Sequence, residues 1–112
     1  MIIYHNPRCS KSRQTLELLR QKKVDPEIIE YLKNPPSKKT IGEIIIALNV
    51  SAHDILRTKE SAYADAGLCK TSSAKQIIDA IVENPILLER PIVVSKNGAT
   101  IGRPPENVLG LM

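Results

Sequence analysis

The chain has 112 residues, the length of one domain with a buried core, and this length leaves no room for a separate substrate domain. It has no Trp, no Phe and three Tyr, so we expect an aliphatic core and no aromatic platform on which bases stack. The net charge of +4 is small, and the clusters of basic residues lie where helices are expected to end. A nucleic-acid partner is therefore not expected.

The two cysteines and the apolar runs favour the cytoplasm. The longest unbroken aliphatic run, residues 44–48, is too short to span a bilayer, so we expect no membrane association. Only three apolar residues separate Met1 from His5, which is not the pattern of a signal peptide. We expect both thiols to be reduced, and no spacing of Cys and His indicates a metal site. No bound cofactor is expected either.

The chain begins with a strand, a helix and a second strand. Residues 1–4 are apolar, Asn6 and Pro7 form a turn dipeptide, and residues 12–22 carry leucines at helical spacing. Residues 27–32 have the pattern of a strand. A βαβ unit of this kind makes the two strands parallel and places the first loop at the carboxyl edge of the sheet, where sites commonly form.

Helices are expected in the middle of the chain and a hairpin near its end. After Pro35 and Pro36, helical patterns cover residues 41–48, 51–57, 61–66 and 74–83. A strand over 91–95, the Asn97-Gly98 turn and a strand over 100–103 form the hairpin, and a short helix over about 104–109 closes the chain. The pattern predicts an α/β fold, with βαβ, a helical insertion over about residues 37–84, and ββα.

The predicted order of elements places Cys9 where a cysteine can be reactive. It is expected at or just before the N-terminus of the first helix, where unpaired backbone N–H groups stabilise an anion. Arg8, Lys11 and Arg13 add positive charge, and no carboxylate precedes Glu17. These features favour a thiol with a lowered pKa, and hence a nucleophile, over a cysteine that serves as a small buried hydrophobic residue.

Two other kinds of cysteine site do not fit the spacing. A cysteine phosphatase loop needs arginine at position 15, where the chain has Thr15. A dithiol redox site needs a second cysteine at position 12, where the chain has Ser12. Cys9 is therefore expected to act as a single thiol that depends on an external thiol or on the distant Cys69, which we interpret as a partly buried structural residue.

Two residues close to Cys9 are candidates for supporting its thiolate. A cationic His5 imidazole would stabilise the thiolate, although a histidine hydrogen-bonded at the strand edge explains the residue nearly as well. Ser12 either hydrogen-bonds the thiolate or, like Ser10, caps the helix.

Three arginines further along the chain stand at unusual places. Arg57 ends a short expected helix, Arg90 directly precedes Pro91, and Arg103 lies between the last strand and Pro104. Each is interpreted as a surface charge unless the fold brings it to Cys9, where guanidinium groups would bind a tetrahedral oxyanion.

Several motifs, in order along the chain, resemble those of the ArsC family of glutaredoxin-linked arsenate reductases, particularly its shorter members. They are the His5-Asn6-Pro7-x-Cys9-x-x-Ser12-Arg13 loop, Leu56-Arg57, Asn84-Pro85-Ile86-Leu87, Arg90-Pro91-Ile92-Val93-Val94 and Arg103-Pro104. The resemblance implies one thioredoxin-like domain over residues 1–112 with a mixed four-stranded sheet. It also implies a cis bond between Arg90 and Pro91.

The same resemblance implies a reaction. Cys9 would attack arsenate while Arg57, Arg90 and Arg103 bind the oxygens. His5 and Ser12, chosen from their places near Cys9, complete the set of candidate catalytic residues. Glutathione as co-substrate and glutaredoxin would then resolve the adduct and release arsenite. Two alternatives remain open: a glutathione-linked thiol oxidoreductase for which arsenate is not the physiological substrate, and an Spx-like regulator that binds a protein partner without catalysis.

Overall fold

The computed structural model describes residues 1–112, which divide into two compact units. Met1–Asn34 and Arg90–Met112 form one, called here the sheet unit, and Pro35–Glu89 form the other, called the helical unit. None of the helices has the length and apolar character needed to cross a lipid bilayer.

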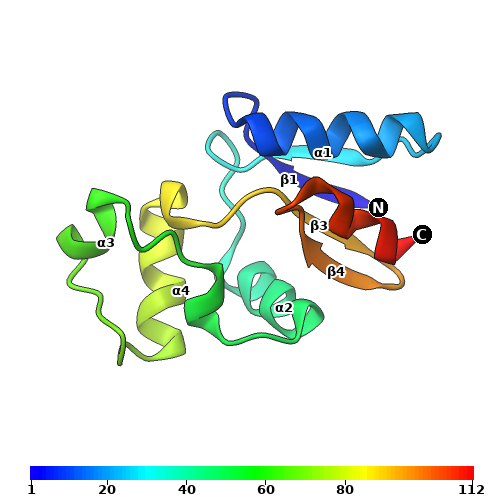
Figure 1. Ribbon diagram of the computed structural model, residues 1–112. Coiled ribbons are helices and arrows are strands. Elements are labelled where there is room, and N and C mark those ends of the chain that lie inside the picture. Colours follow the sequence, from blue (N-terminus) through cyan, green and yellow to red (C-terminus); the bar gives the residue numbers. More distant parts are fainter. The chain divides into compact units, whose positions relative to one another are not determined.

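The sheet unit is built on one mixed four-stranded sheet (Figure 1). The strand order is β2-β1-β3-β4; β1 pairs with β2 in parallel, and β3 pairs with both β1 and β4 in antiparallel. This topology confirms the predicted βαβ start and the closing hairpin. The elements of the unit are β1 (Ile2–His5), α1 (Ser10–Gln21), β2 (Glu27–Glu30), β3 (Ile92–Ser95), β4 (Gly98–Ile101) and the 3-10 helix η3 (Pro105–Leu111).

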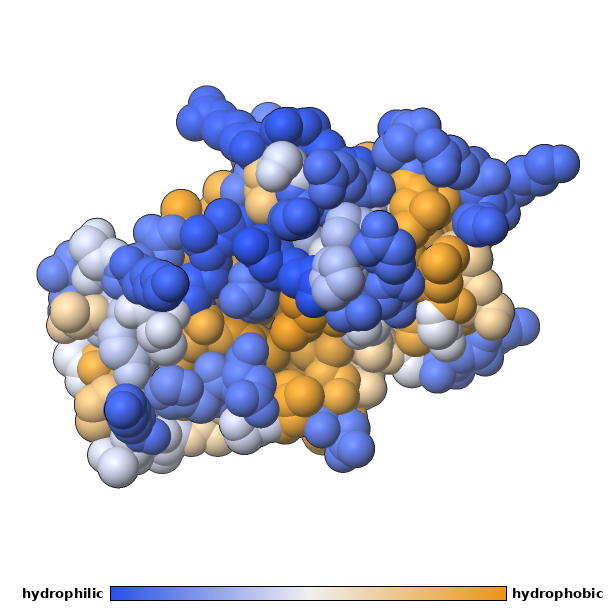
Figure 2. Space-filling model, in the orientation of Figure 1, coloured by the Kyte–Doolittle hydropathy of each residue, from blue (hydrophilic) through white to orange (hydrophobic).

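Helices α1 and η3 pack on one side of this sheet around an aliphatic core. Alternation along β1 and β3 turns Ile3 and Val93 toward the helices, and the register places these two residues opposite each other. Leu16 and Leu19 of α1 meet them at helical spacing, and the outer side of α1 is hydrophilic (Figure 2). The core consists of Ile3, Leu16, Leu19, Val93, Val108 and Leu111.

A glycine allows α1 to approach the end of β4 closely. A Cβ atom on Gly102 would lie 2.6 Å from Thr15 Oγ1 and 2.9 Å from Pro91 Cγ, so any side chain there would push the helix away. The next residue, Arg103, is thereby held near the first turns of α1. The bond between Arg90 and Pro91 is cis, as the family resemblance implies, and the bond between Arg103 and Pro104 is also cis.

The helical unit contains two longer helices and three short ones. Ser37 Oγ accepts a hydrogen bond from Thr40 N–H and caps the first of them, while Ser73 and Gln76 form the predicted reciprocal capping box of α4. The predicted bounds of α4 are confirmed. The helix expected over 51–57 is instead a single 3-10 turn. The elements are α2 (Lys38–Leu48), η1 (Ala52–Ile55), α3 (Ser61–Asp65), α4 (Ala74–Glu83) and η2 (Pro85–Leu87).

The helical unit includes the whole segment expected as an insertion, residues 37–84. That the chain is one domain with this insertion stays a prediction about its organisation.

Candidate active site

Cys9 is the N-cap residue of α1, as its place between strand and helix predicts. Its backbone is extended, with φ −93° and ψ 122°, and its carbonyl accepts the N–H of Arg13 at 3.0 Å. The loop before it is a tight turn in which Cys9 N–H donates to Asn6 O at 3.0 Å and Arg8 N–H donates to Asn6 Oδ1 at 3.0 Å. The helix begins two residues earlier than expected, because no side chain caps it and the usual sequence signal is absent.

The surroundings of the Cys9 sulfur lower the pKa of the thiol. Burial, the largest single influence, acts in the opposite direction and disfavours the thiolate. The backbone N–H of Ser12, the guanidinium of Arg90 and the backbone N–H of Lys11 donate to the thiolate or attract it, and together they outweigh burial. The direction of the shift agrees with the activated thiol that the sequence predicts.

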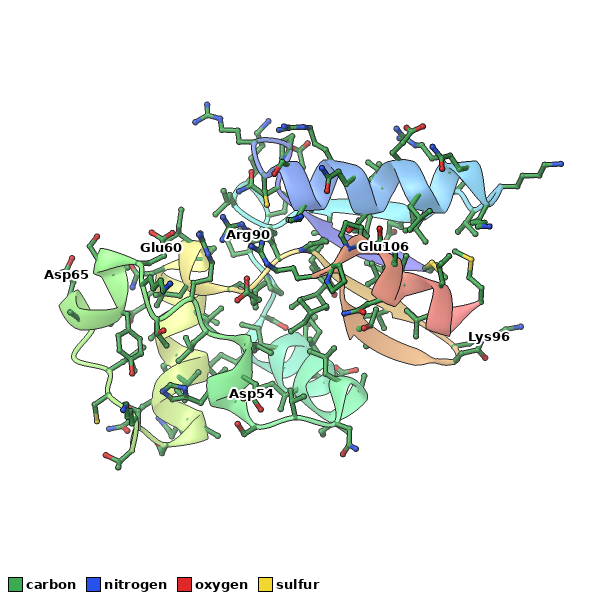
Figure 3. All side chains as sticks on the ribbon, viewed as in Figure 1. Asp54, Glu60, Asp65, Arg90, Lys96 and Glu106 are labelled. Atoms are coloured by element: carbon green, nitrogen blue, oxygen red, sulfur yellow. The ribbon has the colours of Figure 1, made fainter.

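Two of the three distant arginines lie at this thiol. Arg90 is on the segment that leads into β3 (Figure 3), and the hydrogen bonding and charge of its guanidinium lower the pKa of the Cys9 thiol. Arg103 Nη1 lies 4.0 Å from Cys9 Sγ and donates to the carbonyl of Arg90 at 3.2 Å. The sheet unit thus gathers one thiol and two guanidinium groups from opposite ends of the chain.

Arg57 belongs to the helical unit. Its Nη1 pairs with Glu60 Oε1 at 2.6 Å, and its backbone N–H donates to Leu87 O at 2.8 Å. A part for Arg57 in binding an oxyanion stays a prediction.

His5 and Ser12 form a buried hydrogen-bonded group beneath the loop. His5 Nδ1 lies 2.6 Å from Ser12 Oγ, and the same oxygen accepts the N–H of Asn6 at 3.0 Å. The backbone N–H of Ser12 is one of the causes that lower the pKa of the Cys9 thiol, while its side chain bonds His5 and Asn6 and makes no cap hydrogen bond to α1. Asn6 is the member of this group that sequence reasoning missed; its Asn-Pro turn indicated a loop but no role.

The surroundings of His5 disfavour the cationic form considered for it. Burial is the main cause that lowers the pKa of the imidazole; Glu30 opposes the shift, and Arg20 and Arg13 reinforce it. A neutral imidazole hydrogen-bonded to Ser12 fits the second of the two interpretations. His5 supports the loop in this arrangement, and its part in catalysis stays a prediction.

Cys69, expected to be partly buried, is exposed. It lies two residues after Gly67, whose positive φ of 73° makes the turn that follows α3. Thr71 Oγ1 lies 3.2 Å from its sulfur and is the main cause that lowers the pKa of this thiol, with Ser72 adding to the effect. The expectation failed because burial depends on the path of the chain, which the local sequence did not reveal.

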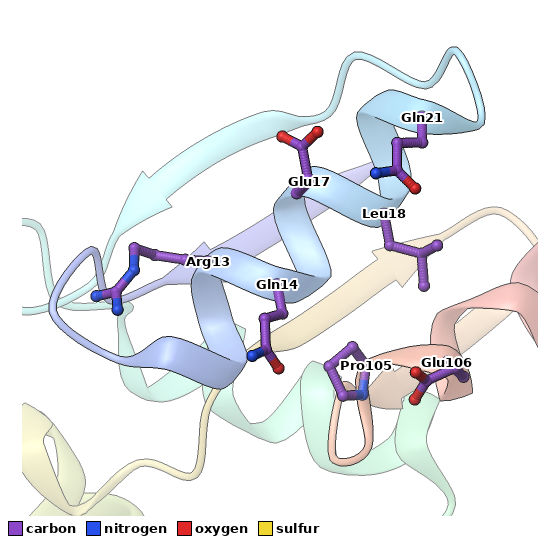
Figure 4. Close-up of a pocket in the computed structure, with 7 residues that line it drawn as sticks. All are labelled: Arg13, Gln14, Glu17, Leu18, Gln21, Pro105 and Glu106. Atoms are coloured by element: carbon purple, nitrogen blue, oxygen red, sulfur yellow. The ribbon is translucent and has the colours of Figure 1, made fainter.

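A cleft of about 710 Å³ runs along α1 and η3 in the sheet unit (Figure 4). Its lining combines polar and apolar side chains, and no sequence motif predicted it. The residues that line it are Arg13, Gln14, Glu17, Leu18, Gln21, Pro105 and Glu106. No cluster of three or more His, Cys, Asp or Glu side chains capable of holding a metal ion occurs in the structure.

The fold and the site define a thioredoxin-like protein with a single thiol at a helix N-terminus and arginines beside it. A model of the ArsC family matches residues 4–111. The chain is 40% identical to the arsenate reductase of Rhizobium meliloti, an alignment that covers 98% of this chain and 79% of that protein. The chain belongs to the ArsC family.

Two further relatives extend this comparison. A protein of Escherichia coli named "Uncharacterized protein YfgD" is 47% identical, with 98% of this chain and 94% of that protein covered. The solved structure of the arsenate reductase from Vibrio cholerae superimposes with a TM-score of 0.95 at 40% identity, covering 99% of this chain and 96% of that one. The relatives support an oxidoreductase.

Proposed function

We propose that this protein reduces arsenate to arsenite in the cytoplasm, with Cys9 as nucleophile and with glutathione and glutaredoxin as the source of electrons. The observation that carries the proposal is the group formed by Cys9, Arg90 and Arg103. A sulfur with a lowered pKa, two guanidinium groups and backbone N–H donors provide both the nucleophile and the charge that a tetrahedral oxyanion needs.

The first step joins sulfur to arsenic. The Cys9 thiolate attacks arsenic(V), and one arsenate oxygen leaves as water after protonation. Arsenate carries negative charge at neutral pH, so its approach to an anionic sulfur requires cations. Arg90 and Arg103 supply them at the sulfur, and Arg57 is proposed as a third. No oxidation or reduction has occurred at this stage.

The electrons come from outside thiols. The thiol of glutathione displaces a second oxygen of the adduct as water and forms an arsenic–sulfur bond. The glutaredoxin thiolate then attacks the glutathione sulfur, so a disulfide forms between them and the electron pair of the arsenic–sulfur bond stays on arsenic. Hydrolysis of the resulting Cys9–arsenic(III) bond releases arsenite and restores the thiol. The sheet unit contains no second cysteine, which is consistent with this dependence.

The test is arsenite production by the purified protein with arsenate, glutathione and glutaredoxin. We expect arsenite to form only when all three are present, and a Cys9→Ser variant to form none above background. Arsenite at the level of the Cys9→Ser variant, from a normally folded protein, would remove the proposal.

A second candidate is a glutathione-linked thiol oxidoreductase that does not use arsenate. It is favoured by the chemistry of the site, because a thiol with a lowered pKa can attack a disulfide as well as arsenic. In that case the Cys9 thiolate would attack the glutathione sulfur of a mixed disulfide between glutathione and a small thiol, and release the small thiol. A second glutathione would then restore the Cys9 thiol and leave as glutathione disulfide, and no arsenite would form. Running both assays on one preparation separates the two candidates.

A further inference from the structure

Three exposed cations surround the Cys9 loop: Arg8, Lys11 and Arg13, called here the cationic rim. Arg13 is tied to the loop, since its Nη1 donates to Pro7 O at 2.9 Å. The first turn of α1 contains no acidic residue. A helix N-terminus carries a partial positive charge, so positive side chains there are unfavourable for the helix. The rim is therefore not explained by the stability of α1.

The rim charges are also not neutralised within the chain. Arg8 and Lys11 take part in no ion pair, whereas Lys38 and Lys75 both pair with Asp79, at 3.0 and 3.1 Å. Exposed cations on one loop without a counter-charge repel each other. They attract any anionic surface that comes to Cys9.

A small oxyanion at the sulfur has other cations to bind it. Arg90 is the guanidinium that acts on the thiolate, and Arg103 Nη1 lies 4.0 Å from the sulfur. Lys11 lowers the pKa of the Cys9 thiol through its backbone N–H, and its side-chain charge is not among the causes of that shift. The rim is thus a second layer of positive charge outside the proposed oxyanion site.

A recess of about 260 Å³ opens beside the rim, and its surface is almost wholly apolar. Leu32 contributes to it and is 41% exposed. Arg8 belongs both to the rim and to the wall of the recess. An apolar centre with a charged border is the arrangement found in protein interfaces. The residues that line the recess are His5, Asn6, Pro7, Arg8, Glu30, Leu32 and Lys33.

We propose that the cationic rim and this recess are the docking surface for the protein that brings a thiol to the Cys9 loop. The partner then carries acidic side chains around its reactive cysteine and one apolar side chain that enters the recess. The inference rests on the proposed function, because that reaction brings an outside protein thiol to the loop at each turnover. A tripeptide thiol has too few groups to meet both the rim and the recess.

The test measures thiol exchange at Cys9 without arsenate. In a Cys69→Ser background, dithiodipyridine converts Cys9 into a mixed disulfide with thiopyridine. A probe thiolate attacks the Cys9 sulfur, forms a new disulfide and releases thiopyridine, whose absorbance gives the rate. The probes are two blocked peptides with one cysteine beside a leucine, flanked by aspartates in one and by lysines in the other. Each rate is divided by that peptide's rate with dithiodipyridine alone.

We expect the aspartate peptide to react at least about tenfold faster than the lysine peptide at low salt, with the difference closing as salt screens the charges. An Arg8→Gln, Lys11→Gln double variant removes most of this advantage. A matched Lys22→Gln, Lys96→Gln variant removes the same amount of charge from exposed positions away from the loop. In this variant the aspartate peptide should keep its advantage. Replacing the leucine by glycine slows the aspartate peptide severalfold.

Equal rates for the two peptides would overturn the proposal, as would an advantage that the rim variant leaves intact. A peptide without leucine that reacts as fast as its parent would remove the recess from the interface. If glutathione shows the same rim dependence as the aspartate peptide, the rim attracts small anionic thiols and the protein interface is wrong. Because no arsenate is used, these outcomes are distinct from a failure of arsenite production.

Discussion

The two cysteines of this protein are alike in having hydrogen-bonded sulfurs, but the groups that surround each sulfur differ. Both thiols accept hydrogen bonds, and the pKa of each is lowered. At Cys9 the donors are backbone N–H groups of a helix N-terminus and a guanidinium. At Cys69 they are the hydroxyls and the backbone N–H groups of Thr71 and Ser72 in an exposed loop, and no cation is among them. A lowered thiol pKa therefore needs only donors, whereas an oxyanion site also needs positive charge beside the sulfur.

The supports of the two loops differ as well. Ser12 is fully buried and its hydroxyl joins His5 to the backbone of Asn6. The corresponding serine in the other loop, Ser72, is partly exposed, and water can replace its contacts. The position of Cys9 is fixed by the interior of the sheet unit, and that of Cys69 by its own loop.

The largest difference is expected when each sulfur is removed. Cys9→Ser should reduce arsenite production to background, because a hydroxyl cannot form the arsenic–sulfur adduct. Cys69→Ser should leave the rate within about twofold of the wild type. The measurement is arsenite formed with glutathione and glutaredoxin, with thermal unfolding as the check on folding. Loss of activity in both variants would indicate that Cys69 is a resolving thiol and would contradict the claim that only Cys9 is required.

Removing a guanidinium beside Cys9 should weaken arsenate binding. Arg90→Ala and Arg103→Ala are each expected to weaken it roughly 10- to 100-fold, the range for a hydrogen bond to a charged group. Isothermal titration in the Cys9→Ser background measures the binding step without chemistry, and Lys96→Ala serves as a matched charge control. An affinity equal to that of the control would make these arginines surface charges. The same titration with Arg57→Ala tests the third arginine.

The two serines provide the matched test of support. Ser12→Ala leaves His5 Nδ1 and Asn6 N–H without their shared buried partner, so we expect a loss of roughly 1–3 kcal/mol in the free energy of unfolding. Ser72→Ala should cost less than about 0.5 kcal/mol because its loop is exposed. Denaturant titration at one pH measures both. Equal losses would mean that the Cys9 loop is no better supported than the Cys69 loop.

Alkylation measured against pH distinguishes the two causes of a lowered pKa. With one cysteine present at a time, both thiols should titrate at a pH below that of an ordinary thiol, about 8.5. Arg90→Gln should raise the midpoint for Cys9 and not for Cys69. Thr71→Val should raise it only for Cys69. If Arg90→Gln leaves the alkylation midpoint of Cys9 unchanged, this arginine does not stabilise the thiolate.

The smallest effect is the pH dependence contributed by His5. The pKa of the imidazole is lower in the folded protein than its ordinary value of 6.5, so below about that pH the unfolded chain binds more protons. Folding stability from His5 is therefore complete above that value and is lost as the pH falls through the folded pKa. Unfolding at a series of pH values, compared with His5→Gln, measures the difference. A variant with an unchanged pH dependence would show that His5 does not titrate differently on folding.

The sequence predicted the parts of this fold that depend on local pattern. The βαβ start, the bounds of α4 with its Ser73 cap and the Asn97-Gly98 hairpin follow from periodicity and turn chemistry. The start of α1 was placed two residues late, because Cys9 is an N-cap without a side-chain hydrogen bond. The exposure of Cys69 was missed, since it depends on the turn at Gly67.

The candidate site was predictable only in part for the same reason. The place of Cys9 before a helix predicted a lowered thiol pKa, but residue types do not reveal that the backbone N–H of Ser12, not its hydroxyl, contributes to it. Nor does local sequence bring Arg90 and Arg103 to Cys9; the pairing of β3 with β1 and the close approach at Gly102 do so. Only the resemblance to a family linked these arginines to the thiol in advance.

The central claim, that Cys9 and the arginines beside it form an arsenate site, is tested most directly by a crystal structure of the protein soaked in arsenate. We predict arsenic bonded to Cys9 Sγ, with Arg90 and Arg103 hydrogen-bonded to its oxygens. An unmodified Cys9, or an anion at the thiol that neither arginine contacts, would contradict the claim.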